Sequence, residues 1–360
     1  MAVSNHNLRF DPLRGNARGD RYLNHYKGTI VLALKIGKIG VETPVFLAPM
    51  AGITDVPFRN LVSRFGAGLV VCEMVASQEM VQAKPSTRMK AQLGFDQQNT
   101  SVQIAGREAH WMAEAARICE ANGAQLLDIN MGCPAKKVTS GASGSALMKE
   151  PDLAISLVEA VVQAVDIPVT LKMRLGWDEG CLNAPDLAKR AENAGVQMVT
   201  VHGRTRCQFY KGQADWEAIN KVVEAVDIPV VANGDIVDLE SATQALKASK
   251  AYGIMIGRGI QGKPWLIHEV SQNLAGRRGT LTPDIDAFIE IIAGHYDDIL
   301  SFYGVTLGVK NARKHLGWYF DQIEGSDGLR GKMFRENDPK AVLSHILELK
   351  NVAQSLRDAA

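Results

Sequence analysis

Short apolar runs alternate with amphipathic segments between about residues 41 and 257. Each run is continuously apolar, which indicates strands buried on both faces, as in a parallel sheet. The intervening segments have helical periodicity, so the pattern predicts repeated β/α units. The predicted strands are Val45–Pro49, Leu69–Glu73, Ser101–Ile104, Leu126–Asn130, Val169–Met173, Met198–His202, Pro229–Ala232 and Ile254–Ile256.

Internal similarity supports this interpretation. The segment VDIPV occurs at Val165–Val169 and again at Val226–Val230, each time after an amphipathic helix and at the start of a strand. Repeated units with short, right-handed connections close into a barrel. We therefore predict an α/β fold, an eight-stranded parallel (β/α)8 TIM barrel over residues 41–280. The alternative, a doubly wound open sheet, is disfavoured because no GxGxxG motif follows the first strand.

The two ends of the chain have a different character. Residues 1–28 are polar, arginine-rich and without periodicity, which predicts a loosely ordered segment within an N-terminal extension over residues 1–40. After Pro264 the pattern becomes purely helical, with segments at about 284–303, 306–320 and 338–356. We expect a C-terminal helical domain over residues 281–360.

Composition limits the possible functions. The 360 residues exceed the about 250 that a bare barrel needs. The net charge is +1, but basic residues gather in 1–40 and 306–335, which permits a polyanionic partner. The five cysteines form no CxxC pair, which argues against a disulfide framework and a metal site. No signal peptide or bilayer-length apolar segment is visible, so we expect a cytoplasmic protein, monomeric and without a membrane partner.

Polar residues follow nearly every predicted strand. Active sites of β/α barrels lie at the carboxyl ends of the strands, so a ring of such residues predicts a catalytic mouth. In strand order the residues are Pro49, Met50 and Ala51; Glu73; Gln103; Asn130 and Cys133; Lys172 and Arg174; His202 and Arg204; Asn233, Gly234 and Asp235; and Gly257 and Arg258.

The chemistry of these residues suggests a phosphorylated ligand. Glycines after the seventh and eighth strands allow close approach of backbone N–H groups, and Arg258 offers a charge-assisted hydrogen bond. Lys172 suits either negative charge on a reduced flavin or a Schiff base with a carbonyl substrate. Gln103 matches the edge of an isoalloxazine ring, and His202 its ring or phosphate. Cys133 follows a strand end, where a thiol serves as nucleophile or general acid.

These residues fall in longer motifs that resemble one family, the flavin-dependent tRNA-dihydrouridine synthases, and most closely its bacterial B-type branch. DINMGCP and HGRTR are the most specific of them. The matching segments are Ala48–Asp55, Asp128–Pro134, Lys136–Val138, His202–Arg206, Ala232–Ile236, Gly257–Gly259 and Arg313–Tyr319.

The resemblance implies FMN at the barrel mouth, reduced by NADPH. The reduced flavin would deliver hydride to C6 of a uracil in tRNA, and the Cys133 thiol would protonate C5. The implied cofactor residues are Pro49, Met50, Ala51, Gln103, Lys172, His202, Asn233, Gly234, Asp235, Gly257 and Arg258. The implied substrate residues are Asn130, Arg174 and Arg204 at the mouth and Lys310, Arg313 and Lys314, which share one helix face.

Other functions remain open from the residues alone. A flavin enzyme related to dihydropyrimidine or dihydroorotate dehydrogenase would share the barrel and thiol but act on a free base; the basic helical domain argues against it. A Schiff-base aldolase would use Lys172 without flavin. A barrel that only binds RNA would not need the complete ring of polar residues.

Overall fold

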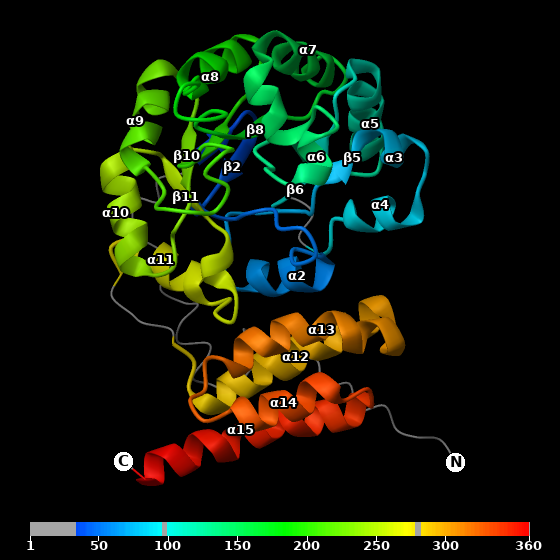
Figure 1. Cartoon of the computed structure of the whole chain (residues 1–360), viewed down its shortest axis with the longest axis vertical. Coiled ribbons are helices and arrows are strands. Elements are labelled where there is room, and N and C mark those ends of the chain that lie inside the picture. Colours follow the sequence, from blue (N-terminus) through cyan, green and yellow to red (C-terminus); the bar gives the residue numbers. More distant parts are fainter. Residues whose placement is uncertain (1–33, 96–98, 278–281, 360) are drawn as a thin grey trace. The chain divides into compact units, whose positions relative to one another are not determined.

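The computed structural model describes residues 34–95, 99–277 and 282–359, which separate into two compact units. The larger unit, 34–260 with 265–277, contains a closed parallel sheet (Figure 1). Eight strands pair in the order β4-β3-β11-β10-β9-β8-β7-β6, and β6 pairs back to β4. The predicted TIM barrel is therefore confirmed. Its strands are β3 (Val45–Leu47), β4 (Leu69–Val71), β6 (Thr100–Ala105), β7 (Leu126–Met131), β8 (Val169–Arg174), β9 (Val199–His202), β10 (Val230–Asn233) and β11 (Gly253–Ile256), with a short β5 (Val75–Ala76) beside β6.

Helices surround the barrel, and several begin at side-chain caps. The Asp55 carboxylate accepts from Phe58 N at 3.0 Å before α2, and Asp215 accepts from Ala218 N at 2.8 Å before α9. The helices of this unit are α2 (Val56–Arg64), α3 (Ser77–Val81), α4 (Pro85–Lys90), α5 (Ala109–Ala121), α6 (Lys136–Thr139), α7 (Pro151–Val162), α8 (Ala184–Asn193), α9 (Trp216–Ala225), α10 (Leu239–Ser249) and α11 (Leu266–Leu274), with 3-10 turns η1 (Gly144–Lys149) and η2 (Arg258–Ile260).

A hairpin precedes the barrel within the predicted extension, of which residues 1–33 lie outside the described residues. Strands β1 (Leu34–Ile36) and β2 (Ile39–Val41) pair antiparallel around Gly37, whose φ of +56° favours glycine. Apolar hairpin side chains join one buried cluster with residues at the amino ends of strands, such as Leu126. The hairpin therefore covers the end of the barrel opposite the strand carboxyl ends. The sequence pattern did not predict this hairpin.

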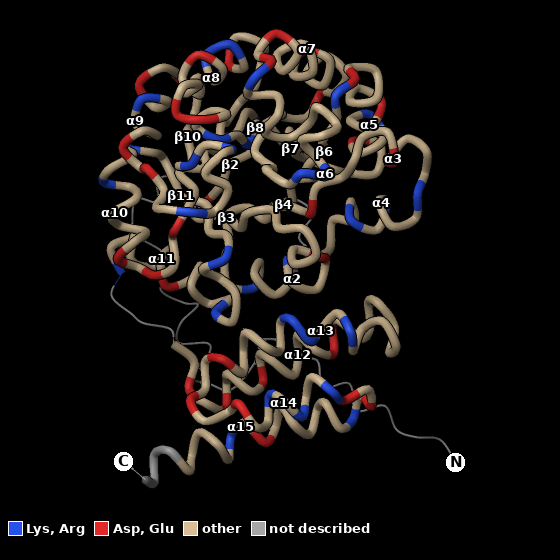
Figure 2. Tube along the Cα trace, in the orientation of Figure 1, with Lys and Arg blue, Asp and Glu red and all other residues tan. Residues whose placement is uncertain are grey.

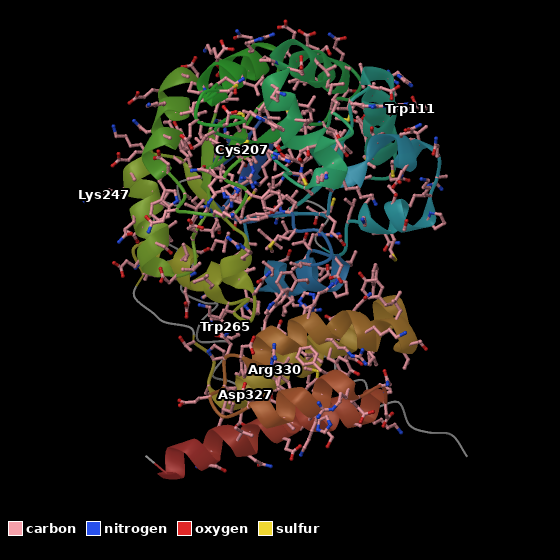
Figure 3. All side chains as sticks on the ribbon, in the orientation of Figure 1. Trp111, Cys207, Lys247, Trp265, Asp327 and Arg330 are labelled. Carbon is pink, nitrogen blue, oxygen red and sulfur yellow. The ribbon has the colours of Figure 1, made fainter. Side chains whose placement is uncertain are left out.

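The smaller unit, 261–264 with 282–359, is helical. Helices α12 (Ile285–Tyr303), α13 (Val305–Phe320) and α15 (Pro339–Ala359) match the three predicted segments, and α14 (Asp327–Arg335) was missed. Its sequence, DGLRGKMFR, contains two glycines and a short apolar face, which weakens a helical pattern. On α14, Arg330 (Figure 3) stacks over the Phe334 ring at 4.7 Å and pairs with Asp321 at 2.9 Å.

No described helix is both long and apolar enough to cross a membrane.

Candidate active site

The barrel register brings the predicted polar residues to one mouth. Asn130 of β7 lies beside Lys172 of β8, and Arg174 lies beside His202 of β9. His202 in turn neighbours Asn233 of β10. Because all these strands are parallel, their carboxyl ends meet on one side of the barrel, as the sequence predicted.

Lys172 is a buried cation of the mouth, with 9% of its surface exposed. Its Nζ donates to Asn233 Oδ1 at 3.0 Å, and Asn233 Nδ2 donates to Met255 O at 2.8 Å. Burial, followed by the nearby Arg174 charge, lowers the pKa of Lys172 to about 8. The acceptor is a neutral amide, so an anion bound at the mouth would stabilise the charged form of Lys172.

His202 lies among several positive charges. Burial holds the pKa of His202 well below its usual value, and the charges of Lys172, Arg174, Arg204 and Arg258 add to this effect. The imidazole is therefore neutral at pH 7. Its Nε2 lies 3.3 Å from Arg204 Nη1, which makes it an acceptor in that contact.

Arg204 is almost fully buried and forms a clamp. Nη1 and Nη2 donate to the two carboxylate oxygens of Asp235 at 2.9 and 2.6 Å. Its other donors reach Lys211 O and Gly212 O, and Asp235 also accepts from Ala214 N at 2.7 Å. The clamp thus fastens the loop after β9 to the turn after β10. These bonds favour a structural role, while the contacts of Arg204 with substrate and of Asp235 with cofactor stay predictions.

The turn after β10 requires a glycine at position 234. Gly234 has φ +118°, and an added Cβ would lie 2.8 Å from Ala214 Cβ and 2.9 Å from His202 Cδ2. At Gly257 a Cβ would meet only ordinary contacts, the nearest at 3.8 Å from Ala48 Cβ. Arg258 beside it is exposed. The loop after β11 thus offers open backbone at Gly257 and an exposed arginine, as a phosphate site needs.

The loop after β3 also presents backbone at the mouth. Pro49 and Met50 are half-buried, and Ala51 is exposed. Met50 N donates to the Thr54 hydroxyl at 3.0 Å, which closes the turn. Gly52 N donates to the buried Glu73 carboxylate at 2.5 Å. Two side chains therefore fix the path of this loop.

Cys133 is half-buried in a loop that is held on both sides. Its N–H donates to Asn130 Oδ1 at 3.0 Å. Its carbonyl accepts from Ser145 N and Oγ at 3.1 and 2.9 Å. Cys72 and Cys119 are buried, whereas Cys207 (Figure 3) is exposed in the loop after β9. Cys133 is thus the cysteine that the structure brings to the predicted ring of polar residues.

Arg174 ties two loops of the mouth together. It is 1% exposed, and its Nε donates to Gly132 O while Nη1 donates to Thr205 O and Phe209 O, all at 2.8 Å. Its guanidinium lies 5.5 Å from the Tyr210 ring, and Arg258 lies 5.1 Å from the same ring. The contact of Arg174 with substrate stays a prediction.

Two aromatic residues of this mouth were not predicted: Tyr210, which is 47% exposed, and its neighbour Phe209, which has φ +57°. Two consecutive aromatic residues in an otherwise polar loop were the available signal.

The three cations predicted on the helical unit differ in their surroundings. Lys310 on α13 is exposed, and Lys314 is half-buried (Figure 2 shows the basic residues of this helix). Arg313 Nη2 instead donates to Glu336 O and Asn337 Oδ1 at 2.9 and 2.8 Å. Arg313 therefore also braces the turn between α14 and α15, which its helical spacing did not indicate.

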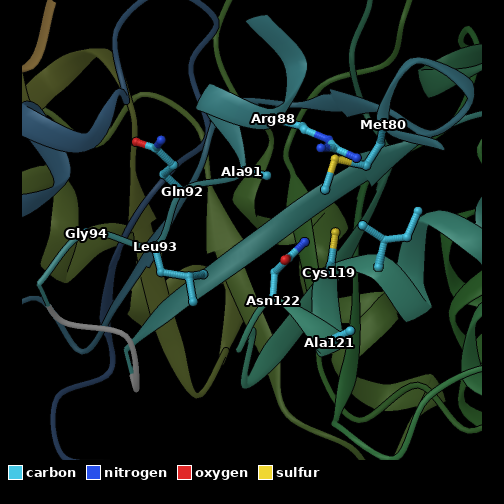
Figure 4. A pocket seen from close by; sticks show the side chains of 10 residues that line it. Met80, Arg88, Ala91, Gln92, Leu93, Gly94, Cys119, Ala121 and Asn122 are labelled. Carbon is cyan, nitrogen blue, oxygen red and sulfur yellow. The ribbon is translucent and has the colours of Figure 1, made fainter. Parts of the chain in front are cut away.

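A hollow of about 480 Å³ lies away from the strand ends, beside α4 and α5 (Figure 4). Met80, Arg88, Cys119 and Asn122 contribute to its lining. Burial raises the pKa of Cys119 to about 12, so this thiol stays protonated. Its lining includes no residue of the predicted site. Within the described ranges, no group of acidic, histidine or cysteine side chains is arranged to hold a metal ion.

Solved structures support the fold. Histamine dehydrogenase from a Rhizobium species matches with a TM-score of 0.54 at 13% identity, covering 75% of this chain and 51% of that one. A 2-naphthoyl-CoA reductase matches with a TM-score of 0.55 at 12% identity, covering 69% and 52%. The chain thus spans about half the length of these structures, and identities this low speak for the barrel alone.

Sequence comparisons go further. A "probable tRNA-dihydrouridine synthase" from Rhodobacter capsulatus is 57% identical over 88% of this chain and 97% of its own length. "tRNA-dihydrouridine synthase B" from Pseudomonas syringae pv. tomato is 44% identical over 88% and 94%. The family model "Dihydrouridine synthase (Dus)" matches residues 46–357. The predicted resemblance is confirmed, and the chain belongs to the dihydrouridine synthase family.

Proposed function

We propose that this protein reduces specific uridines in tRNA to 5,6-dihydrouridine, with FMN as cofactor and NADPH as reductant. The observation that carries the proposal is the concentration of positive charge around His202, where Lys172, Arg174, Arg204 and Arg258 converge. Asp235 pairs with Arg204, which leaves a mouth of net positive charge. Such a mouth suits an anionic, phosphorylated ligand rather than a neutral carbonyl compound.

The residues of the mouth fit FMN. Lys172 and Gln103 would hold the ring edge, His202 would lie near the ring and the phosphate, and the backbone of Pro49–Ala51 would lie along the ring. Gly234, where a Cβ would lie 2.9 Å from His202, lets the turn pack closely against that side chain. Together with Asn233, Asp235, Gly257 and Arg258 it would hold the phosphate. When bound and reduced, the flavin supplies hydride for C6 of a uracil ring.

The chain's own groups supply the proton and the orientation. The Cys133 thiol holds the proton for C5, and its loop is fixed by Asn130 and Ser145. Asn130, Arg174 and Arg204 are the proposed substrate contacts at the mouth. A uridine must leave the stack of folded RNA to enter such a mouth. Lys310, Arg313 and Lys314 would contact phosphates of the tRNA.

A direct experiment tests this function. The purified protein should carry FMN, which NADPH reduces without oxygen. Unmodified tRNA from cells lacking the protein should then reoxidise it, and dihydrouridine should appear in that tRNA. Reoxidation by free uracil or orotate instead would support the free-base alternative. A protein that cannot take up FMN would contradict the proposal.

FMN affinity should depend on pH through Lys172. Acceptor atoms of the ring edge and the negative charge of the nearby phosphate stabilise the charged ammonium and raise its pKa above the value of about 8 in the free protein. The complex then holds more protons than the free protein as pH rises above about 8. We expect the affinity to be constant between about pH 7 and 8, where the phosphate is already ionised, and to fall toward tenfold per unit above that range. Fluorescence titration at several pH values measures this, and Lys172→Met should bind weakly with a flat profile. An equally steep profile in Lys172→Met would assign the effect to another group.

The lysines of α13 should contribute to the salt dependence of tRNA binding. Lys310→Ala with Lys314→Ala, leaving the bracing Arg313 in place, should reduce the slope of log affinity against log salt by about 1.4–1.8. Binding is measured between 50 and 200 mM salt, roughly the range in which phosphate contacts dominate. Reduction of the flavin by NADPH should not change. An unchanged slope would exclude this helix face from the RNA interface.

A further inference from the structure

A chain of hydrogen bonds runs from the barrel interior to the loop of Cys133. It links four side chains on the adjacent strands β6, β7 and β8, each at most 7% exposed: Thr170, Asp128, Gln103 and Asn130. The bonds are Thr170 Oγ1 to Asp128 Oδ1 at 2.6 Å, Gln103 Nε2 to Asp128 Oδ2 at 2.7 Å, Asn130 Nδ2 to Gln103 Oε1 at 2.7 Å, and Gly132 N and Cys133 N to Asn130 Oδ1 at 3.2 and 3.0 Å.

Between Cys133 and Gln103, the donor-to-acceptor direction of these hydrogen bonds is fixed. Backbone N–H groups only donate, so Gly132 and Cys133 require the oxygen of the Asn130 amide. The nitrogen of Asn130 must then donate, which requires the oxygen of Gln103 on that side. The Gln103 nitrogen is left to donate toward residue 128. Every donor in this chain of hydrogen bonds has a partner only if residue 128 accepts a hydrogen bond.

Asp128 supplies that acceptor in either of its protonation states. Burial raises the pKa of Asp128. A proton on Oδ1 would face the Thr170 hydroxyl, which then donates to Leu127 O at 3.2 Å. Oδ2 still accepts from Gln103. The direction of the chain therefore depends on an acceptor at Oδ2 and not on the charge.

We propose that Asp128 is a positioning residue for Cys133. By accepting from Gln103 it sets the orientation of two amides in series, and the second of these, Asn130, holds the N–H groups of the Cys133 loop. The proposal rests on the proposed role of Cys133 as the acid. Without the acceptor, Gln103 gains an unpartnered buried N–H group, and rotation of either amide would turn a donor toward another donor.

Two substitutions distinguish the effect of the acceptor at Oδ2 of Asp128 from the effect of the Asp128 charge. Asp128→Leu removes the acceptor while keeping the same number and branching of side-chain heavy atoms. Asp128→Asn keeps it, because its oxygen can face Gln103 while its nitrogen donates to the Thr170 hydroxyl. We expect backbone amide exchange at Gly132 and Cys133 to accelerate on the order of tenfold in Asp128→Leu and to stay near wild type in Asp128→Asn. Exchange in β9 serves as the control for general loosening.

Flavin half-reactions provide a second readout on the same holoenzymes. Reduction by NADPH should stay within about twofold of wild type in Asp128→Asn. In Asp128→Leu, where Gln103 at the ring edge is also disturbed, reoxidation by tRNA should slow by on the order of tenfold beyond any change in the reduction rate. Exchange rates do not depend on which reaction the enzyme performs, so a failed function assignment would leave them interpretable. Unchanged exchange in Asp128→Leu, or equal acceleration in Asp128→Asn, would overturn the proposal.

A further pair keeps the test decisive if Asp128→Leu does not fold. Thr170→Val alone leaves Oδ2 of Asp128 as the acceptor and should behave as wild type. Asp128→Ala removes the acceptor without adding bulk to the buried site. Fast exchange at Gly132 and Cys133 is expected in Asp128→Ala and not in Thr170→Val. Wild-type exchange in Asp128→Ala would overturn the proposal.

Discussion

Cys133→Ala is expected to bind FMN and to be reduced by NADPH at the wild-type rate, yet to be reoxidised by tRNA slower by a factor of about 10²–10⁴. The thiol is proposed to give its proton only when charge develops at C5 of the uracil, so its loss affects that half-reaction alone. Its loop is held by Asn130 and Ser145, so truncation should leave the backbone in place. Stopped-flow absorbance of the flavin without oxygen measures both half-reactions.

A matched control comes from Cys207, which is exposed in the loop after β9. Cys207→Ala should retain both rates. Cys133→Ser should remain slow, because a hydroxyl is a far weaker acid than a thiol. If Cys133→Ala reoxidises normally with tRNA, the proton comes from another group of the mouth, and Lys172 and Arg174 become the candidates.

Arg204→Met is expected to lower the free energy of unfolding by about 3 kcal/mol. This is the lower end of the range for breaking a buried pair, because the Asp235 side chain is 30% exposed. Loss of the clamp should also free the turn at Gly234, so FMN affinity should fall. Urea unfolding of the apoprotein measures the free energy of unfolding, and flavin fluorescence measures the FMN affinity.

The double variant Arg204→Met/Asp235→Asn distinguishes a lost clamp from a stranded charge. It should recover part of the stability, because the amide that replaces the Asp235 carboxylate carries no uncompensated charge. Arg206→Met, on the same loop, loses a stacking contact with Trp177 at 4.8 Å and should cost at most about 1 kcal/mol. Arg204→Met with wild-type stability and FMN affinity would refute the clamp.

The barrel and its mouth were predictable because both follow from local rules. Buried parallel strands leave continuous apolar runs, and all eight predicted runs are strands of the barrel. Parallel pairing then brings every carboxyl end to one side, so residues as distant in sequence as Gln103 and Arg258 are expected at one mouth without knowledge of their contacts. Predicting which residues lie at the mouth needs only the periodicity of apolar positions and the direction of the strands.

The hydrogen-bond partners were not predictable, because they depend on the paths of loops and the rotation of side chains. Arg204 appeared to be a rim residue, yet its donors reach Asp235 and two carbonyls of its own loop. Arg313 shares a helix face with two lysines, yet it also bonds Asn337. Asp128 lies within the DINMGCP motif, and the sequence indicated no task for it. In each case a partner lies on a different segment, outside any local pattern.

The β1–β2 hairpin has a consequence for biosynthesis. It leaves the ribosome before any strand of the barrel, yet Leu34 and Ile36 share their buried cluster with Met198, Val231 and Met255. The buried cluster around the hairpin can therefore be completed only after some two hundred further residues are translated, and until then part of its apolar face stays exposed. Contacts over such sequence separations form late in folding. Complete docking of the hairpin would then be a late step of folding, which follows the addition of the last strand, β11, to the barrel.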